Sequence, residues 1–206
     1  MQLSLTTPLN PTELRSLEIL GRLRSIFAKK GFDGASMQDL ARAAGMSAGN
    51  FYRYFPSKAA ISDALIGADM DRLEQDFQAA LQTRNPMATL RSQLRDSIRD
   101  HQCQDGCLWA EIHAAALRKP EVGAIIDEME RKVTRFLVQV FGRETGLPLD
   151  EAHIAFAPRA GLVISLFRSA AMIGPPSSAV KEQLTDQILM MIEKTLDEIS
   201  SHRRKD

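Results

Sequence analysis

Apolar residues recur at intervals of three and four along almost the whole of this 206-residue chain, and this spacing constrains the fold more than any other feature. An amphipathic α-helix presents one face at that period, whereas a half-buried strand requires strict alternation. No alternating run of strand length stands out in the sequence. The sequence therefore predicts an all-α protein.

Capping residues such as Ser36, Ser47 and Ser57, and breaking residues such as Gly146, divide this pattern into about nine helices. The first begins after Asn10-Pro11 and is expected to end at Gly31, and Pro158 is expected to bend the eighth because proline removes a backbone donor. The remaining helices are predicted over about 36–44, 48–54, 58–82, 87–102, 107–117, 121–141, 150–173 and 180–200.

Composition excludes several other classes of protein. Hydrophobic residues make up 44% of the chain and charged residues 25%, which is typical of a soluble globular domain and not of a disordered chain. No run of ~18 consecutive apolar residues predicts a membrane span, and the amino terminus lacks the pattern of a signal peptide. We therefore expect a cytoplasmic protein.

The charges of the chain cancel in total but are unevenly distributed. Residues 1–60 hold eight basic and four acidic side chains, a net charge of +4, and the remainder carries −4. A basic region of this kind favours a nucleic-acid partner.

Two short helices, over about 36–44 and 48–54, meet across the glycine-containing turn Ala44-Gly45-Met46-Ser47. This is the layout of a helix-turn-helix, in which the first helix braces a second whose exposed side chains enter the DNA major groove. Helical hairpins are also common in protein cores, so the chemistry of the second helix has to decide between the two interpretations. Phe51 and Phe55, four residues apart, would anchor its inner face.

The outward positions of this second helix are small or hydrogen-bonding. Asn50 has the amide that pairs with adenine in the major groove, and the hydroxyls of Tyr52 and Tyr54 suit phosphates. Arg53 suits either a base or the backbone. Lys58 lies at a helix N-terminus, where partial positive charge attracts phosphate. These residue types favour DNA binding over a purely structural hairpin.

The motif Gly31-Phe32, Ser36, Leu40-Ala41, Ala44-Gly45-Met46-Ser47 and Phe51-Tyr52-Arg53-Tyr54-Phe55-Pro56-Ser57-Lys58 resembles the DNA-binding signature of the TetR family of transcriptional regulators. The resemblance implies an N-terminal three-helix DNA-binding domain, residues 1–57, followed by a larger helical domain for effector binding and dimerisation, residues 58–206. It also implies base contacts at Ala48, Gly49 and Asn50, and phosphate contacts at Ser36, Tyr52, Tyr54 and Lys58.

The full set of expected DNA-binding residues combines the resemblance with the chemistry of the helix. Ala48 and Gly49 have no hydrogen-bonding side chains, so direct base readout falls on Asn50 and Arg53, and DNA shape supplies the rest of the specificity. The set is Ser36, Met37, Ser47, Ala48, Gly49, Asn50, Tyr52, Arg53, Tyr54 and Lys58.

The resemblance further implies a homodimer formed by the last two helices, 150–173 and 180–200. The first of these is apolar almost all round from Ala157 to Ile173, so more than one of its faces needs covering. The alternative is that both helices pack within a monomer.

An effector pocket is expected among the middle helices, lined by aromatic, sulfur-containing and polar side chains. Plain core packing is the alternative for the apolar members, and pairing with an acidic residue such as Glu111 is the alternative for Arg159. The candidates are Met70, Phe77, Cys107, Trp109, His113, Phe136, Phe156, Arg159 and Phe167.

We expect neither a metal site, nor a cofactor, nor an enzyme. Cys103 and Cys107 lack the further ligands of a metal site and are interpreted as ordinary thiols, although a redox pair is conceivable. No phosphate-binding glycine loop, HExxH or GxSxG motif occurs.

The predicted function is that of a repressor released from a palindromic operator by a small molecule. A helical small-molecule carrier and a protein-binding adaptor are the alternatives, but neither explains the segment from Ser47 to Lys58.

Overall fold

The computed structural model describes residues 11–100, 106–173 and 178–202. In these ranges the chain forms nine helices and no strand, so the all-α prediction is confirmed. The helices are α1 (Pro11–Gly34), α2 (Met37–Ala43), α3 (Ala48–Tyr54), α4 (Lys58–Leu81), α5 (Pro86–Asp100), α6 (Gly106–Ala116), α7 (Pro120–Thr145), α8 (Leu149–Met172) and α9 (Ala179–Ser200).

The capping residues act as the sequence predicts. Ser47 and Ser57 accept hydrogen bonds from the backbone at the starts of α3 and α4, and Ser36 forms a capping box at the start of α2. α7 ends at Thr145, four residues beyond its predicted end, and Gly146 closes it in the left-handed conformation. α8 continues through Pro158, and its bend stays a prediction.

The first helix departs from expectation in one respect. Its helical path breaks at Gly31, where φ is 72° and ψ is 167°, but one further helical turn follows and extends α1 to Gly34. This backbone region is essentially restricted to glycine. The break therefore redirects the chain into α2 without ending the helical turns.

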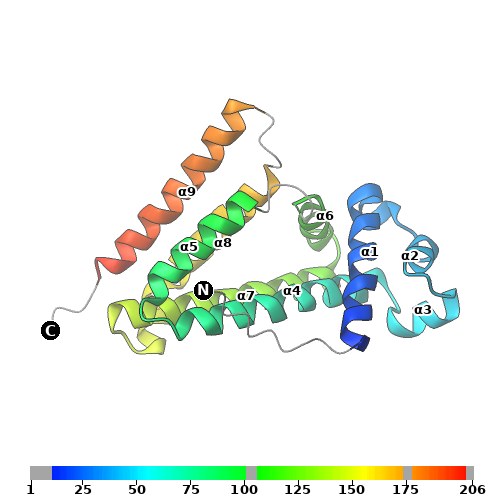
Figure 1. Ribbon diagram of the computed structural model, residues 1–206, viewed down its shortest axis with the longest axis horizontal. Helices are drawn as coiled ribbons and strands as arrows, with labels where there is room; N and C mark the ends of the chain where they lie inside the picture. Colours follow the sequence, from blue (N-terminus) through cyan, green and yellow to red (C-terminus); the bar gives the residue numbers. More distant parts are fainter. Residues whose placement is uncertain (1–10, 101–105, 174–177, 203–206) are drawn as a thin grey trace.

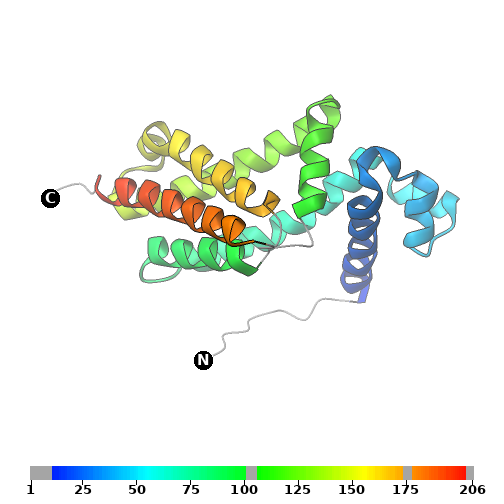
Figure 2. The ribbon, with the colours of Figure 1, turned by 90° about the horizontal axis from the view of Figure 1, so that it is seen from above.

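Helices α1–α3 form one end of the elongated molecule, and α4 leads from them into the C-terminal helices (Figure 1). α7 is the central helix of that part, since it packs against α4, α5, α6, α8 and α9. Both views place α6 beside α1 (Figures 1 and 2), and these two helices are in contact. α6 thus connects the two ends of the molecule.

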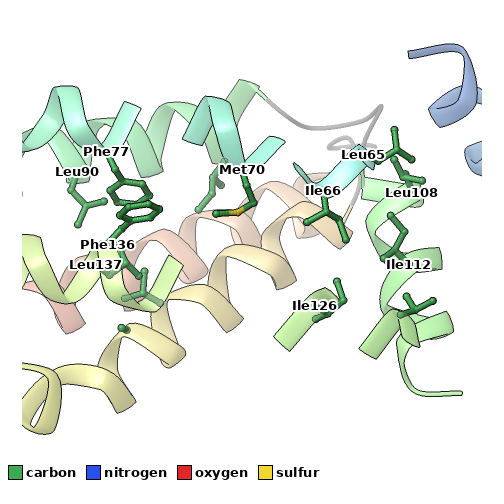
Figure 3. Close-up of a cluster of buried hydrophobic side chains, with 14 of the residues drawn as sticks. Leu65, Ile66, Met70, Phe77, Leu90, Leu108, Ile112, Ile126, Phe136 and Leu137 are labelled. Atoms are coloured by element: carbon green, nitrogen blue, oxygen red, sulfur yellow. The ribbon is translucent and has the colours of Figure 1, made fainter. Parts of the chain in front are cut away.

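One continuous core runs through the molecule, from Leu23 and Phe27 of α1 to Leu196 of α9. In its middle the ring of Phe77 stacks on that of Phe136, with centroids 5.1 Å apart, beside Leu90 and Leu137 (Figure 3). The continuity means that α4 belongs to the cores of both ends.

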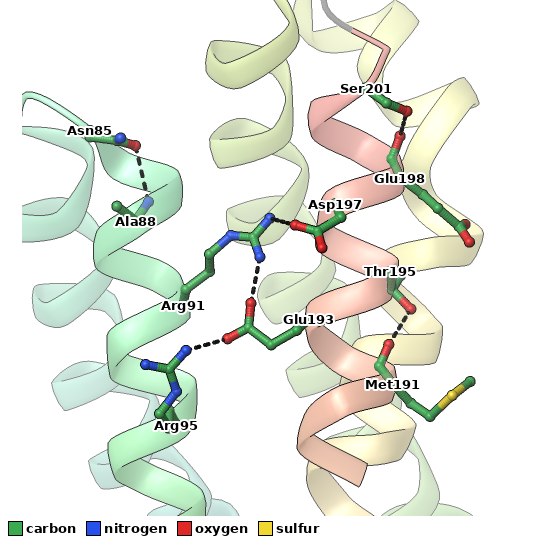
Figure 4. Close-up of polar contacts among 10 residues, drawn as sticks. All are labelled: Asn85, Ala88, Arg91, Arg95, Met191, Glu193, Thr195, Asp197, Glu198 and Ser201. Atoms are coloured by element: carbon green, nitrogen blue, oxygen red, sulfur yellow. Dashed lines mark hydrogen bonds and ion pairs between the residues drawn. The ribbon is translucent and has the colours of Figure 1, made fainter. Parts of the chain in front are cut away.

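Ion pairs join α9 to α5 (Figure 4). Glu193 accepts hydrogen bonds from Arg91 and, at 2.7 Å, from Arg95, and Arg91 also pairs with Asp197 at 2.8 Å. These contacts turn one polar side of α9 toward α5.

One helix of the described chain, α8, is long and apolar enough to cross a membrane by length and composition alone, and only 17% of its most apolar stretch is buried in the chain. On α8 the exposed apolar side chains include Ile154 and Leu162, and on α9 they include Val180, Leu184 and Met191. Both helices therefore leave apolar side chains uncovered.

Candidate DNA-binding site

The inner side of α3 is fixed by packing. Phe51 is fully buried, and its ring centroid lies 5.2 Å from that of Phe55. The Ser47 hydroxyl accepts from the Asn50 backbone N–H at the start of the helix. α3 is thus held by its cap and by one face, as the sequence predicts.

The opposite side of α3 faces solvent at the end of the molecule (Figure 1). Ala48, Gly49, Asn50 and Arg53 are exposed, as are the two tyrosines, Tyr52 at 46% and Tyr54 at 60%. The structure therefore brings the expected base-contacting and phosphate-contacting side chains of α3 onto one accessible helix.

Asn50 and Arg53 are coupled to each other. The guanidinium of Arg53 donates to Asn50 Oδ1 at 3.0 Å and lies 5.3 Å from the ring centroid of Tyr54. A side-chain pair three residues apart on a helix is close enough for this contact. Both residues were predicted from the sequence as base-reading residues, but their contact with each other was not. This contact holds the Arg53 side chain along the exposed face of α3.

α2 braces α3 through a tight turn and a strongly capped start. Gly45 adopts a φ of 68° in the turn, and the Met46 N–H donates to the Ala41 carbonyl at 3.1 Å. Ser36 exchanges hydrogen bonds with Asp39. Lys30, 3.0 Å from Asp39, and then Ser36 lower the pKa of the Asp39 carboxyl to about 2.

Two of the expected DNA-binding residues are only partly free. Met37 is half-buried and packs against the core. The ammonium of Lys58 donates to the carbonyls of Phe32 at 2.8 Å and Asp33 at 3.0 Å. Burial, and then the charge of Lys119, lowers the pKa of Lys58. The phosphate contact of Lys58 stays a prediction, and its contact with α1 was not foreseen from the sequence.

The expected effector residues do not gather at one place. Phe77, Phe136 and Met70 lie in the core between α4 and α7 (Figure 3), and Phe156 packs edge-on against Phe141. Arg159 pairs with Glu198 of α9, at 3.9 Å, and not with Glu111. Cys103 and the side chain of Cys107 lie outside the described residues.

Trp109, His113 and Phe167 are half-buried, and His113 lies near a charged pair. The rings of Trp109 and His113 lie 6.1 Å apart on α6, and Arg168 of α8 donates to Glu130 of α7 at 2.6 Å. Burial, and then the positive charge of Arg168, lowers the pKa of His113. The His113 imidazole of α6 thus lies close to an ion pair between α7 and α8.

A separate open pocket of about 630 Å³ lies at the far ends of α4 and α7. Its lining includes Gln78, Gln139 and Arg143, and none of the expected effector residues. No sequence pattern predicts this pocket, because its walls come from helix ends and a loop. In the described part of the chain, no group of three His, Cys, Asp or Glu residues is arranged to hold a metal ion.

A capped and braced second helix with an exposed polar face defines a helix-turn-helix DNA-binding protein. Residues 19–65 match the family model described as "Bacterial regulatory proteins, tetR family". The chain is a transcriptional regulator of the TetR family. It is not an enzyme.

Two curated relatives are similar over most of the chain. The HTH-type transcriptional regulator UidR of Escherichia coli (strain K12) is 28% identical over 136 residues, which is 66% of this chain and 67% of the relative. The HTH-type transcriptional regulator BetI of Cronobacter sakazakii is 27% identical over 169 residues, or 79% of this chain and 82% of the relative.

Solved structures share the fold along nearly the whole chain. Salmonella enterica GusR superposes with a TM-score of 0.69 at 22% identity, covering 96% of this chain and 98% of its own. AibR, solved in complex with isovaleryl coenzyme A and operator DNA, gives a TM-score of 0.62 at 22% identity and covers 86% of this chain and 97% of its own. The predicted order, a helix-turn-helix followed by a larger helical part, is thereby confirmed.

Proposed function

We propose that this protein is a dimeric, cytoplasmic repressor that binds a roughly palindromic operator through α3 and releases it when a small molecule binds the helices of residues 58–206. The observation that carries the proposal is the exposed outer face of α3, with Asn50 and Arg53 side by side on a helix whose inner face is buried. Residues 1–57 would form the DNA-binding domain.

The dimer is supported by the uncovered apolar surface of α8 and α9. Two copies related by a two-fold axis would bury each other's exposed Ile154, Leu162, Val180 and Leu184. Symmetric pairing would also present two α3 helices to successive major grooves, about 34 Å apart. A palindromic operator follows from that symmetry.

The effector site is proposed at the junction of α6, α7 and α8. Trp109 and His113 of α6 and Phe167 of α8 are half-buried, and the charges of the Arg168–Glu130 pair act on His113, so aromatic and polar groups occur together at this junction. The AibR structure holds a small organic ligand together with operator DNA. Ligand binding would shift the population toward a conformation with wrongly spaced α3 helices.

The test is selection of duplexes from a random library by the purified full-length protein at moderate salt. Enrichment of an inverted repeat supports both specific binding and two-fold symmetry. A folded, dimeric protein that enriches nothing, and shows no salt-dependent binding to DNA, contradicts the proposal and favours a helical small-molecule carrier.

The selected duplex then becomes the probe for release. Candidate small molecules are added to the complex, and loss of fluorescence anisotropy reports dissociation. His113→Ala and Arg168→Ala should raise the concentration of an active compound needed for release, whereas Arg131→Ala, on the exposed side of α7, should not. Equal response in all three variants contradicts the proposed effector site.

A further inference from the structure

Phe32 and Asp33, which follow the break in α1 at Gly31, are held by side chains of α6 and of the turn after it. The Phe32 backbone N–H donates to Oε2 of Glu111, on α6, at 2.8 Å, across 79 positions of sequence. Because the helical path breaks at Gly31, this amide begins a new turn, where a backbone N–H needs a partner outside its own helix. A carboxylate is a strong acceptor for it.

Gly31 allows the carboxylate to approach this closely. A Cβ atom at this position would lie 3.0 Å from Glu111 Oε2 and 3.3 Å from its Cδ. The positive φ of Gly31 also turns the Phe32 amide out of the path of α1. The break in α1 and the acceptor on α6 therefore fit each other.

Contacts from the turn after α6 flank this hydrogen bond. Arg118 lies 3.0 Å from the carboxylate of Asp33, and Lys119 also pairs with it. Hydrogen bonds from Lys119 and then Arg118 lower the pKa of Asp33. The ammonium of Lys119 lies 4.9 Å from the ring centroid of the buried Phe32.

We propose that Glu111 is a positioning residue of the DNA-binding unit, α1–α3. It fixes the end of α1 to α6, so that the orientation of α3 depends on the position of α6. The exposed Asp33 pairs add little alone, since ion pairs in solvent are weak. The proposal rests on the proposed function. The effect of a small molecule bound at α6 would be transmitted to α3 through this contact, and the effect of operator binding would be transmitted to α6 in return.

The first measurement follows amide hydrogen exchange over residues 31–47 in the free full-length protein. Glu111→Ala leaves the Phe32 amide without its acceptor, and we expect exchange of this segment to become about tenfold faster or more. Glu111→Gln keeps a carbonyl acceptor and should restore most of the protection, and Glu111→Asp, which loses reach, should be intermediate.

Glu74→Ala, on the exposed side of α4, is the matched control and should exchange like the wild type. Circular dichroism checks that each variant is folded. Wild-type exchange rates over residues 31–47 in both Glu111→Ala and Glu111→Asp overturn the proposal.

The second measurement adds the duplex selected in the library experiment. In the wild type and in Glu74→Ala, DNA bound at α3 should slow exchange over residues 106–119, which lie outside the proposed DNA contacts. In Glu111→Ala the duplex should still bind, but the factor by which DNA slows exchange over residues 106–119 should be about tenfold smaller than in the wild type.

Two results of the second measurement overturn the proposal: a wild type without remote slowing, or a Glu111→Ala variant that retains it. If the wild type selects no duplex at all, it is the proposed function that fails. Exchange over residues 31–47 in the free protein then still decides the positioning role of Glu111.

Discussion

At the scale of single residues, the side-chain amide of Asn50 has two roles. Its Oδ1 accepts a hydrogen bond from Arg53 in the free protein, and the same amide is expected to contact a base in the DNA complex. A residue in contact with another does not contribute independently. The specificity of α3 is therefore a property of the pair.

Asn50→Ala should weaken binding of the selected duplex by about 1–3 kcal/mol and relax the base preference at one position of each half-site. Because the same change also frees Arg53, the Asn50→Ala/Arg53→Ala double variant should lose less than the sum of the two single losses. Anisotropy titrations at one salt concentration measure all three. Strict additivity, with an unchanged sequence preference, would show that the pair does not read bases.

Asp39 gives the start of α2 a defined pH dependence. Its carboxyl has a pKa of about 2 in the folded chain, below the ordinary 3.8, because Lys30 and Ser36 stabilise the charged form. A carboxyl whose pKa is lowered in the folded state stabilises the fold at pH values above its ordinary pKa. This stabilisation is lost as the pH falls through the pKa of the folded state.

The melting temperature of Asp39→Asn should accordingly lie below that of the wild type at pH 7, and the difference should narrow between about pH 4 and pH 2. Asp63→Asn, an exposed residue of α4, serves as the control with no such convergence. Thermal unfolding followed by circular dichroism across that range provides the measurement, and a gap that stays constant with pH would contradict it.

At the scale of helices, what the sequence could predict was local. Periodicity gave nine helices, and Ser36, Ser47, Ser57 and Gly146 stand at the ends where capping rules put them. These signals act within one helical turn, so no knowledge of the partner helices is needed.

Contacts between distant helices were beyond such rules. Lys58 bonds to carbonyls about 26 positions away, and Glu111 bonds to an amide 79 positions away. Spacing along one helix does not specify which other helix lies opposite. Arg159 shows the same limit. The sequence suggested an acidic partner as one alternative, and Arg159 does pair with a carboxylate, but that carboxylate belongs to Glu198 and not to Glu111.

Gly31 tests the break in α1. Gly31→Ala should lower the free energy of unfolding by about 1–3 kcal/mol, because φ and ψ there lie in a region essentially closed to other residues. Gly21→Ala, in the same helix with open space around its Cα, should instead be neutral or stabilising. Urea unfolding of both variants checks the contrast, and equal effects would exclude a special role for the break.

Glu193 tests the junction of α5 and α9 shown in Figure 4. Glu193→Ala removes two partly buried ion pairs, with Arg91 and Arg95, and should cost about 1 kcal/mol at low salt and less at high salt. Asp186→Ala removes one exposed pair with Arg99, at 3.8 Å, and should cost almost nothing. Chemical unfolding at two salt concentrations measures both. A Glu193 effect no larger than that of Asp186 would contradict the assignment.

At the scale of the whole molecule, the uncovered surface of α8 and α9 decides the assembly. We expect Leu162→Glu to convert a dimer into a monomer, because a charge would be buried at the two-fold interface. Leu117→Glu changes a side chain that is 90% exposed on the turn after α6 and should leave the mass unchanged. Sedimentation analysis gives both masses.

Operator binding should follow the assembly state. The monomeric Leu162→Glu variant should keep its helical circular dichroism and lose high-affinity binding to the inverted repeat, since only one half-site is engaged at a time. If it remained dimeric, the two-fold axis would have to lie on another surface.

The fixed inner side of α3 has a consequence for how this regulator can change over evolutionary time. Ser47 and Phe51 keep the helix in place, while Ala48, Gly49 and Asn50 are exposed and lie outside the hydrophobic core. Exposed substitutions away from structural contacts usually alter stability by less than ~0.5 kcal/mol. New operator preferences are therefore accessible by single substitutions that selection for foldedness does not oppose.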